Sequence, residues 1–220
     1  MMVSPEAYYE YHLKGKTAAE ILSVIRGLKR EIGHLKKMME DTDYGPVIVP
    51  STMDHLDSGV PSRLQHARAY LAKAQAALAE AGGIYNPSQA ELRAITFNAN
   101  IPAISQIVLS TGKVNKTPEV RTIIPSNDHL TITLQQPYRV LVNETVPMTR
   151  DDFLAAVRSI HIGEWRKNYS PHKTRYDVSK DIRWELQVYY ANGSKPFTAS
   201  GRSCYPYNFF LLRQLFQLQD

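Results

Sequence analysis

The spacing of apolar residues changes from a helical period to a strand period near the middle of this chain. In the first half, two seams repeat in alternating steps of three and four residues, which is the heptad spacing of packed helices. The first seam follows Thr17 and Glu20, which match a capping box at a helix N-terminus. We therefore predict an antiparallel helical hairpin in which one seam faces the other, made by Ile21, Ile25, Leu28, Ile32, Leu35 and Met39 on one helix and Leu64, Ala67, Leu71, Ala74, Leu78 and Ala81 on the next.

The first seam could instead join two chains. A heptad seam serves a coiled-coil dimer as well as a hairpin, and the stretch from Ile21 to Met39 holds about three heptads. Gly27 and Gly33 interrupt the helix, and each costs about 1 kcal/mol relative to alanine. Two glycines can also let helices approach closely. The sequence leaves a hairpin core and a homodimer through this seam as alternatives.

A third helix and a domain boundary are expected after the second seam. The helix should begin after residues 86–88, run through Ile95 and break at residues 100–102, where a proline cannot continue it. A short helical continuation should then carry Ile104, Ile107 and Val108 and end at Gly112. Because the following stretch is polar and contains Gly and Pro, we read it as a linker. The predicted domains are a helical domain over residues 1–112 and a second domain over residues 113–220.

The second half alternates apolar and polar residues, as half-buried strands do. Strands are predicted at residues 120–124, 129–134 and 138–142, followed by a helix that Thr149 caps. Residues 183–200 then read as a hairpin, and a last helix follows at about residue 209. The expected order is β-β-β-α-β-β-α, an antiparallel sheet covered by helices. Together with the helical hairpin, this predicts an α+β fold.

The hairpin is the clearest local signal in this half. Asn192-Gly193 is a strong hairpin dipeptide, because a type I′ turn needs positive φ at both central residues. A two-residue loop there places Val188 opposite Phe197 and Leu186 opposite Ala199. That register gathers apolar side chains on one face, so the pattern and the turn agree.

Motif searches give no catalytic, metal-binding or cofactor-binding residue. The sequence has no phosphate-binding glycine loop, no H-E-x-x-H and no C-x-x-C. Its one cysteine, Cys204, excludes an intramolecular disulfide, and no apolar run reaches the length of a membrane span. His161 and Glu164 could share a helix face as an acid–base pair, but helix surfaces commonly carry such pairs. We expect a cytoplasmic protein without metal or cofactor, and a non-enzymatic role over an enzymatic one.

Charge gives the best functional indication. The formal net charge is +5, which favours polyanionic partners. Residues 12–37 contain seven Lys and Arg against two Glu, and residues 166–176 contain four Lys and Arg with no acid. Cations interleaved with tyrosines suit phosphate contact and base stacking, although solvated helix ends look similar. The candidate binding residues are Lys29, Arg30, Lys36, Lys37, Arg166, Lys167, Tyr169, Lys173, Arg175 and Tyr176.

Several short motifs resemble an uncharacterised group of bacterial proteins carried on phages and mobile elements. The resemblance covers both halves and rests on Ser4-Pro5-Glu6, residues 8–16, residues 161–166, Trp184-Glu185-Leu186, Tyr190, Asn192-Gly193, Lys195-Pro196, Gly201 and residues 205–209. The group has no assigned activity, so the resemblance implies a context and no residue roles. Accessory proteins of mobile elements commonly act on host defence or on nucleic acid.

The function expected from these observations is non-enzymatic binding of nucleic acid or a nucleoprotein, for example as an anti-CRISPR-like inhibitor. One alternative is a protein–protein adaptor that uses the tyrosine-rich N-terminus or the turn at residues 205–209 as anchors. Another is a sponge for a small nucleotide signal, with Arg and Tyr lining a pocket.

Overall fold

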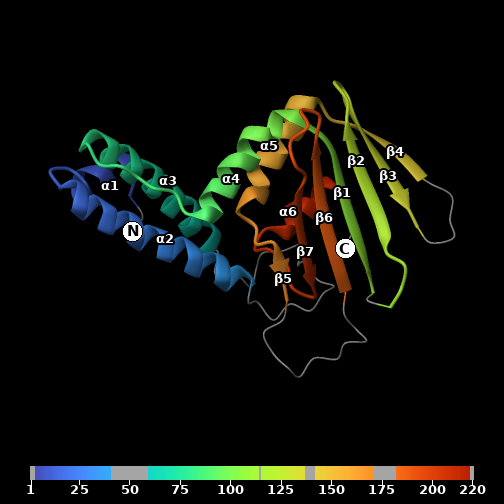
Figure 1. Ribbon diagram of the computed structural model, residues 1–220, viewed down its shortest axis with the longest axis horizontal. Helices are drawn as coiled ribbons and strands as arrows, with labels where there is room; N and C mark the ends of the chain where they lie inside the picture. The colour runs from blue at the N-terminus through green and yellow to red at the C-terminus, as the bar shows by residue number, and fades with distance from the viewer. Residues whose placement is uncertain (1–2, 41–58, 114, 137–141, 171–181, 219–220) are drawn as a thin grey trace. The chain divides into compact units, whose positions relative to one another are not determined.

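Two compact units make up this protein. The computed structural model describes residues 3–40, 59–113, 115–136, 142–170 and 182–218. The described residues up to Pro87 form a helical unit, and those from Ser88 onward form a sheet unit (Figure 1). The predicted boundary at 112/113 is therefore misplaced, because residues 88–112 fold with the sheet.

The helical unit is built on an antiparallel pair of helices. It contains α1 (Pro5–His12), α2 (Ala18–Glu40) and α3 (Gly59–Glu80). Ala18 at the start of α2 lies beside Gly83 after the end of α3, and Glu31 pairs with Arg63 at 3.6 Å. The two helices therefore run in opposite directions, and the predicted helical hairpin is confirmed.

The predicted seam is the core of this hairpin. Five of its six residues on α2 are buried, from Ile21 to Leu35, and Ile21, Ile25 and Leu28 form one cluster with Ala74, Ala77 and Leu78 of α3. Because these side chains are already buried within one chain, a homodimer through the same seam would have to open the hairpin. The capping box is also present, since Thr17 N–H donates to Glu20 at 2.8 Å and holds the pKa of that carboxyl below its ordinary value.

Gly27 and Gly33 do not bring helices together. A Cβ built on either glycine meets no described atom within 4 Å. We expect the double substitution Gly27→Ala/Gly33→Ala to stabilise the helical unit by roughly 1–2 kcal/mol, because alanine loses less backbone entropy in a helix. Urea unfolding followed by circular dichroism at 222 nm measures this gain. A loss of stability would mean that one glycine serves a contact that the hairpin does not show.

The sheet unit contains one seven-stranded sheet with the strand order β4-β3-β2-β1-β6-β7-β5 (Figure 1). All neighbouring strands are antiparallel except β5, which runs parallel to β7. The strands are β1 (Ile104–Lys113), β2 (Glu119–Pro125), β3 (His129–Gln135), β4 (Val142–Pro147), β5 (Asn168–Tyr169), β6 (Ile182–Tyr190) and β7 (Phe197–Arg202). The helices are α4 (Gln89–Asn100), α5 (Arg150–Ile160) and α6 (Phe209–Leu215), with 3-10 turns η1 (Ile101–Ala103) and η2 (Ile162–Glu164).

The central strand β1 corrects the sequence prediction of a short helix. Its register shifts between Ile104 and Gln106, which interrupts the alternation of side chains. As a result Ile104 and Ile107, three residues apart, are both fully buried, and this spacing imitates a helix. The stretch read as a linker is the connection between β1 and β2, so it joins two paired strands and separates no domains.

Most of the other predicted elements have the predicted type, strand or helix. The predicted strands at 120–124 and 129–134 are β2 and β3, and the Thr149-capped helix is α5, where Asp152 N–H donates to the Thr149 hydroxyl at 3.2 Å. The strand predicted at 138–142 lies almost wholly outside the described residues. The partner of β3 is instead β4, which begins at Val142.

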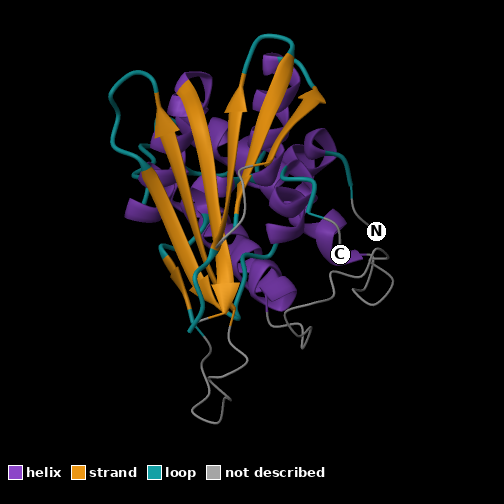
Figure 2. Cartoon of the chain, turned by 90° about the vertical axis from the view of Figure 1, so that its right-hand side faces the viewer, coloured by secondary structure: helices purple, strands orange, loops and turns teal. Residues whose placement is uncertain are grey.

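Helices cover one face of the sheet, and Figure 2 shows the other face toward the viewer. Trp184, Leu186 and Val188 of β6 are buried beneath α4, α5 and α6, in a core that also contains Phe97, Phe153 and Phe209. The residues between them on β6 point to the opposite face, which we call the open face, and are half-buried or exposed. Tyr190 packs against the core on the helix side, and this burial raises its pKa to about 12.

The hairpin β6–β7 has the predicted strand register, but its turn is not of the predicted type. Val188 pairs with Phe197 and Leu186 with Ala199, as the sequence indicates. Gly193 has a φ of 76°, whereas Asn192 keeps a negative φ, so the predicted type I′ turn is wrong. The side chains of Asn192 and Ser194 both bind Asn100 Oδ1, at 2.9 and 3.0 Å, and this tertiary contact shapes the turn.

Candidate nucleic-acid interface

The cations predicted on the first long helix gather on one side of α2. At about 100° per residue, Arg26, Arg30 and Lys37 project within about 40° of one another, and all three are exposed. Lys29 and Lys36 lie on the flank next to the buried seam and are half-buried. We call these five residues the α2 ridge. The structure therefore brings together all four α2 residues that the sequence analysis selected.

The α2 ridge belongs to a part of the sequence with no net charge. Lys29 Nζ lies 3.2 Å from the hydroxyl oxygen of Tyr85 and 5.6 Å from the centroid of its ring, so this cation also holds the segment after α3. Residues 1–87 contain ten Lys and Arg and ten Asp and Glu, whereas residues 88–220 contain sixteen and eleven. The whole net charge of +5 therefore lies in the second stretch of the sequence.

The second predicted zone is only partly described. Arg166 and Lys167 are exposed next to β5, while Lys173, Arg175 and Tyr176 lie outside the described residues. Within this zone Tyr169 is 4% exposed and packs 5.8 Å from the ring of Trp184, so its ring cannot stack on a base. The proposed stacking role of Tyr169 is therefore wrong.

Arg166 of the same zone packs against Tyr169. Its guanidinium lies 4.5 Å from the centroid of the Tyr169 ring, and its backbone N–H donates to the Tyr169 hydroxyl at 2.9 Å. Tyr169 thus helps to hold Arg166 in place, and the Arg166 guanidinium lies over the Tyr169 ring. A cation at this distance from a ring centroid makes a cation–π contact, so Arg166 and Tyr169 are joined by two interactions.

Four further cations meet at one end of the sheet, and the sequence analysis did not select them. Arg183, the second residue of β6, projects on the open face and pairs in register with both Gly112 of β1 and Arg202 of β7. Lys113 ends β1, and Lys116 lies in the connection to β2, where its N–H donates to the Lys113 carbonyl at 3.0 Å. We call Lys113, Lys116, Arg183 and Arg202 the sheet-end cluster.

Three of the four members of the sheet-end cluster line a small hollow at this end of the sheet. The hollow has a volume of about 140 Å³ and is lined by Ser110, Gly112, Lys113, Lys116, Pro118, Arg183 and Glu185. Within the described chain, Lys113, Lys116 and Arg183 make no ion pair. Three cations around one concave space, with a single carboxylate beside them, form a site of net positive charge.

Gly112 lines this hollow and packs closely against Pro118. A Cβ at Gly112 would lie 2.9 Å from the Cα atom of Pro118, which is closer than real contacts allow. Only a glycine therefore lets the β1–β2 connection fold back onto its own strand. This close approach holds Lys116 near Lys113 and Arg183.

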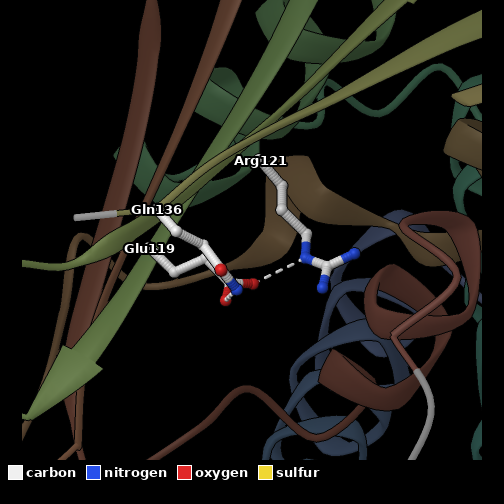
Figure 3. A network of polar contacts seen from close by, with 3 residues as sticks. All are labelled: Glu119, Arg121 and Gln136. Atoms are coloured by element: carbon white, nitrogen blue, oxygen red, sulfur yellow. Dashed lines mark hydrogen bonds and ion pairs between the residues drawn. The ribbon is translucent and has the colours of Figure 1, made fainter. Parts of the chain in front are cut away.

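The opposite face of the same end carries a neutralised pair. Arg121 Nε donates to Glu119 Oε1 at 2.8 Å, and Gln136 Nε2 donates to the other oxygen of that carboxylate at 3.0 Å (Figure 3). Both charged side chains are largely covered. Arg121 thus adds no net charge to this end. Lys113 pairs in register with Ile182 and projects by alternation on this same face, whereas Arg183 and Arg202 project on the open face.

Comparison with protein-family models and with curated proteins found no match. No protein-family model matches the sequence, and no curated protein shows significant similarity to it. The resemblance to proteins of phages and mobile elements therefore stays a prediction, and function has to be argued from the residues of this chain.

Other candidates from the sequence turn out to have structural roles. Glu164 accepts a hydrogen bond from the Tyr207 hydroxyl at 3.0 Å, and His161 adopts a left-handed φ of 54° at the end of α5. In the turn at residues 205–209, Tyr207 and Phe209 are buried in the core, whereas Tyr205 is half-buried. Among the described residues, no three His, Cys, Asp or Glu side chains gather as metal ligands, and none of the helices is long and apolar enough to cross a membrane.

The signal that could have revealed the sheet-end cluster is the uneven charge of the two halves. Its members are spread over ninety positions from Lys113 to Arg202, so no local window contains them. The excess of five cations after residue 87 indicates which half to examine. Locating the cluster within that half requires the strand order.

Proposed function

We propose that this chain is a non-enzymatic nucleic-acid-binding or nucleoprotein-binding protein, acting as an accessory factor of a phage or mobile element. The observation that carries the proposal is the sheet-end cluster, where three cations without ion-pair partners in the described chain line one hollow. Phosphate oxygens are suited to such a site, because lysine and arginine bind them through charge-assisted hydrogen bonds. An anti-CRISPR-like inhibitor is the form of this function that we consider first.

The α2 ridge supports the same proposal as a second surface. Its exposed arginines, Arg26 and Arg30, lie one helical turn apart, which suits contact with successive phosphates of a backbone. Because the helical unit as a whole has no excess charge, we expect the ridge to contribute less affinity than the sheet-end cluster does.

Removing the two lysines of the sheet end should weaken nucleic-acid binding and its dependence on salt. For Lys113→Ala/Lys116→Ala, we expect the slope of log K against log salt to fall by about 1.8 on duplex DNA or about 1.4 on single strands, since each phosphate contact contributes roughly 0.9 or 0.7. Fluorescence anisotropy with labelled duplexes and single strands, from 25 to 200 mM salt, measures both slopes.

The matched control removes the same charge elsewhere in the sheet unit. Arg158 on α5 and Lys195 in the β6–β7 turn are exposed and line neither the hollow nor the ridge. Arg158→Ala/Lys195→Ala should leave the slope nearly unchanged, and Arg26→Ala/Arg30→Ala should produce a smaller reduction than the lysine pair. Undetectable binding of wild-type protein to duplexes, single strands and guide-loaded nuclease complexes at low salt would refute the proposed function.

A further inference from the structure

A row of polar side chains leads from the hollow across the open face of the sheet. Tyr189, Gln187 and Glu185 alternate along β6, so all three project on the same side as Arg183. The Tyr189 hydroxyl donates to Gln187 Oε1, and Gln187 Nε2 donates to Glu185 Oε1 at 2.7 Å. We call these three residues the β6 row.

The hydrogen bonds of the β6 row fix the direction of each side chain. Gln187 uses its oxygen toward Tyr189 and its nitrogen toward Glu185, so its amide orientation is determined from both sides. Because the Tyr189 hydroxyl reaches back to Gln187, the ring leans along the strand toward the hollow. Glu185 in turn is oriented at the edge of the hollow, with one oxygen bound and one carboxylate oxygen left for another donor.

The combined site has three chemically different parts in a line. The hollow offers three cations for a phosphate group, Glu185 offers an acceptor, and Tyr189 offers a half-buried aromatic ring. At about 3.3 Å per residue, the backbone positions of Glu185 and Tyr189 lie about 13 Å apart. A short single strand can place a phosphate in the hollow and a base on the ring at the same time.

We infer that the hollow and the β6 row form a binding site for single-stranded RNA. One phosphate occupies the hollow, a neighbouring ribose donates its 2′-hydroxyl to Glu185, and a base stacks on Tyr189. The 2′-hydroxyl is the group that distinguishes RNA from DNA, and an unpaired carboxylate beside a phosphate disfavours a ligand without a donor. This inference rests on the proposed function, since it specifies the nucleic acid that the sheet end takes.

The surrounding open face fits this ligand. Across the strands next to the β6 row, Thr198 and Ser200 of β7 pair with Gln187 and Glu185, and Val108 and Ser110 of β1 pair with the same two residues. These side chains are short, so a strand of RNA can lie close to the sheet. The hydroxyls of Thr198, Ser200 and Ser110 can bond to sugar and phosphate oxygens without selecting a base sequence.

The test uses two labelled hexanucleotides that differ only in their sugars, hexauridylate and its 2′-deoxy counterpart, with the full chain. We expect wild-type protein to bind the ribonucleotide about tenfold more tightly and to bind uridine monophosphate far more weakly than either hexamer. Glu185→Ala should reduce the preference for ribose to about onefold. Tyr189→Ala should weaken both hexamers about tenfold or more, because base stacking is worth about 1–3 kcal/mol, whereas Tyr189→Phe should retain most of the stacking.

Controls address folding and nonspecific loss. Tyr11→Ala, which removes a tyrosine 76% exposed in the helical unit, should change neither affinity nor sugar preference. Unaltered tryptophan fluorescence would show that each β6 variant is folded.

The outcomes separate this inference from the proposed function. If wild-type protein binds neither hexamer, duplex nor guide-loaded complexes, the proposed function fails and this inference fails with it. If binding depends on Lys113 and Lys116 but is unchanged by Glu185→Ala and Tyr189→Ala, the proposed function stands and the RNA site is overturned. Equal affinity for uridine monophosphate and the ribose hexamer would also overturn it, in favour of a mononucleotide site.

Discussion

Replacing Gly201 by alanine is expected to destabilise the sheet unit by about 3 kcal/mol. Gly201 lies on β7 between Trp184 of β6 and Tyr169 of β5. A Cβ at this position would collide with the Trp184 indole nitrogen and would lie 2.5 Å from the carbonyl oxygen of Cys204 and 2.6 Å from Trp184 Cε2. These two groups are also bound to each other, since the indole N–H donates to that carbonyl at 2.8 Å.

Trp184 has no room to move away from the added methyl group. Its side chain is fully buried, with the rings of Phe209 and Trp165 at centroid distances of 4.8 and 6.1 Å. Overpacking of a core costs about 1–3 kcal/mol, and the loss of a buried hydrogen bond adds about 1–3 kcal/mol. The expected total corresponds to a drop in Tm of roughly 10 °C.

Tryptophan fluorescence measures this effect in the sheet unit alone. The chain has two tryptophans, Trp165 and Trp184, and both lie in the core of the sheet unit. Urea unfolding of Gly201→Ala should show a lower midpoint, while the exposed control Thr198→Ala on the same strand should change stability by less than about 0.5 kcal/mol. A Gly201→Ala protein as stable as the control would mean that the indole can shift without cost.

Local signals in the sequence were enough to predict the helical hairpin and the register of β6 and β7. Both depend on side-chain periodicity over neighbouring residues, and such patterns are fixed by burial of one face. The predicted type of the turn between β6 and β7 was wrong, because a residue far away in the sequence helps to set its conformation. Its conformation depends on Asn100, which lies ninety-two residues away from Asn192.

The strand β1 was missed because its irregularity imitates a helix. Buried residues three apart, Ile104 and Ile107, fit a helical period when the register shift is unknown. What decides between helix and strand is the position of β1 between β2 and β6, where both edges of its backbone are paired. That is a tertiary effect, and the misplaced domain boundary followed directly from it.

In the candidate site, too, the part that depends on neighbouring residues could be predicted, and the part that depends on strand pairing could not. The α2 ridge could be predicted, since a single helix arranges its members. The sheet-end cluster could not, because pairing of β1, β6 and β7 brings Lys113, Arg183 and Arg202 together. Tyr169 was selected for its basic neighbours, but its buried position in β5 depends on docking against Trp184.

Substituting Asn208 should produce the second large loss of stability, because its side chain links two buried groups. Asn208 is 4% exposed, and its Oδ1 accepts the indole N–H of Trp165 at 2.8 Å. Its Nδ2 donates to the carbonyl of Ile160 at the end of α5, which is one of the carbonyls that a helix cannot satisfy internally. For Asn208→Ala we expect a loss of about 3 kcal/mol, since each unpaired buried group costs about 1–3 kcal/mol.

The variant Asn208→Asp separates lost hydrogen bonds from lost volume. An aspartate keeps the size and can still accept from Trp165, but its charged form faces the Ile160 carbonyl without a donor. Burial and this carbonyl should raise the aspartate pKa in the folded state above the unfolded value of about 3.9. Stability is then fully present below the unfolded pKa and is lost as pH rises through the folded pKa.

Asn208→Asp should therefore become more stable relative to wild type between pH 7 and pH 4, while Asn208→Ala should show no such gain. Urea unfolding followed by tryptophan fluorescence at several pH values tests both variants, and Gln214→Ala, an exposed position on α6, provides the control. If Asn208→Asp and Asn208→Ala lose the same stability at every pH, the protonated carboxyl does not replace the amide as donor to Ile160. The link between α5 and α6 would then depend on the packing of Trp165, and the hydrogen bonds of Asn208 would contribute little.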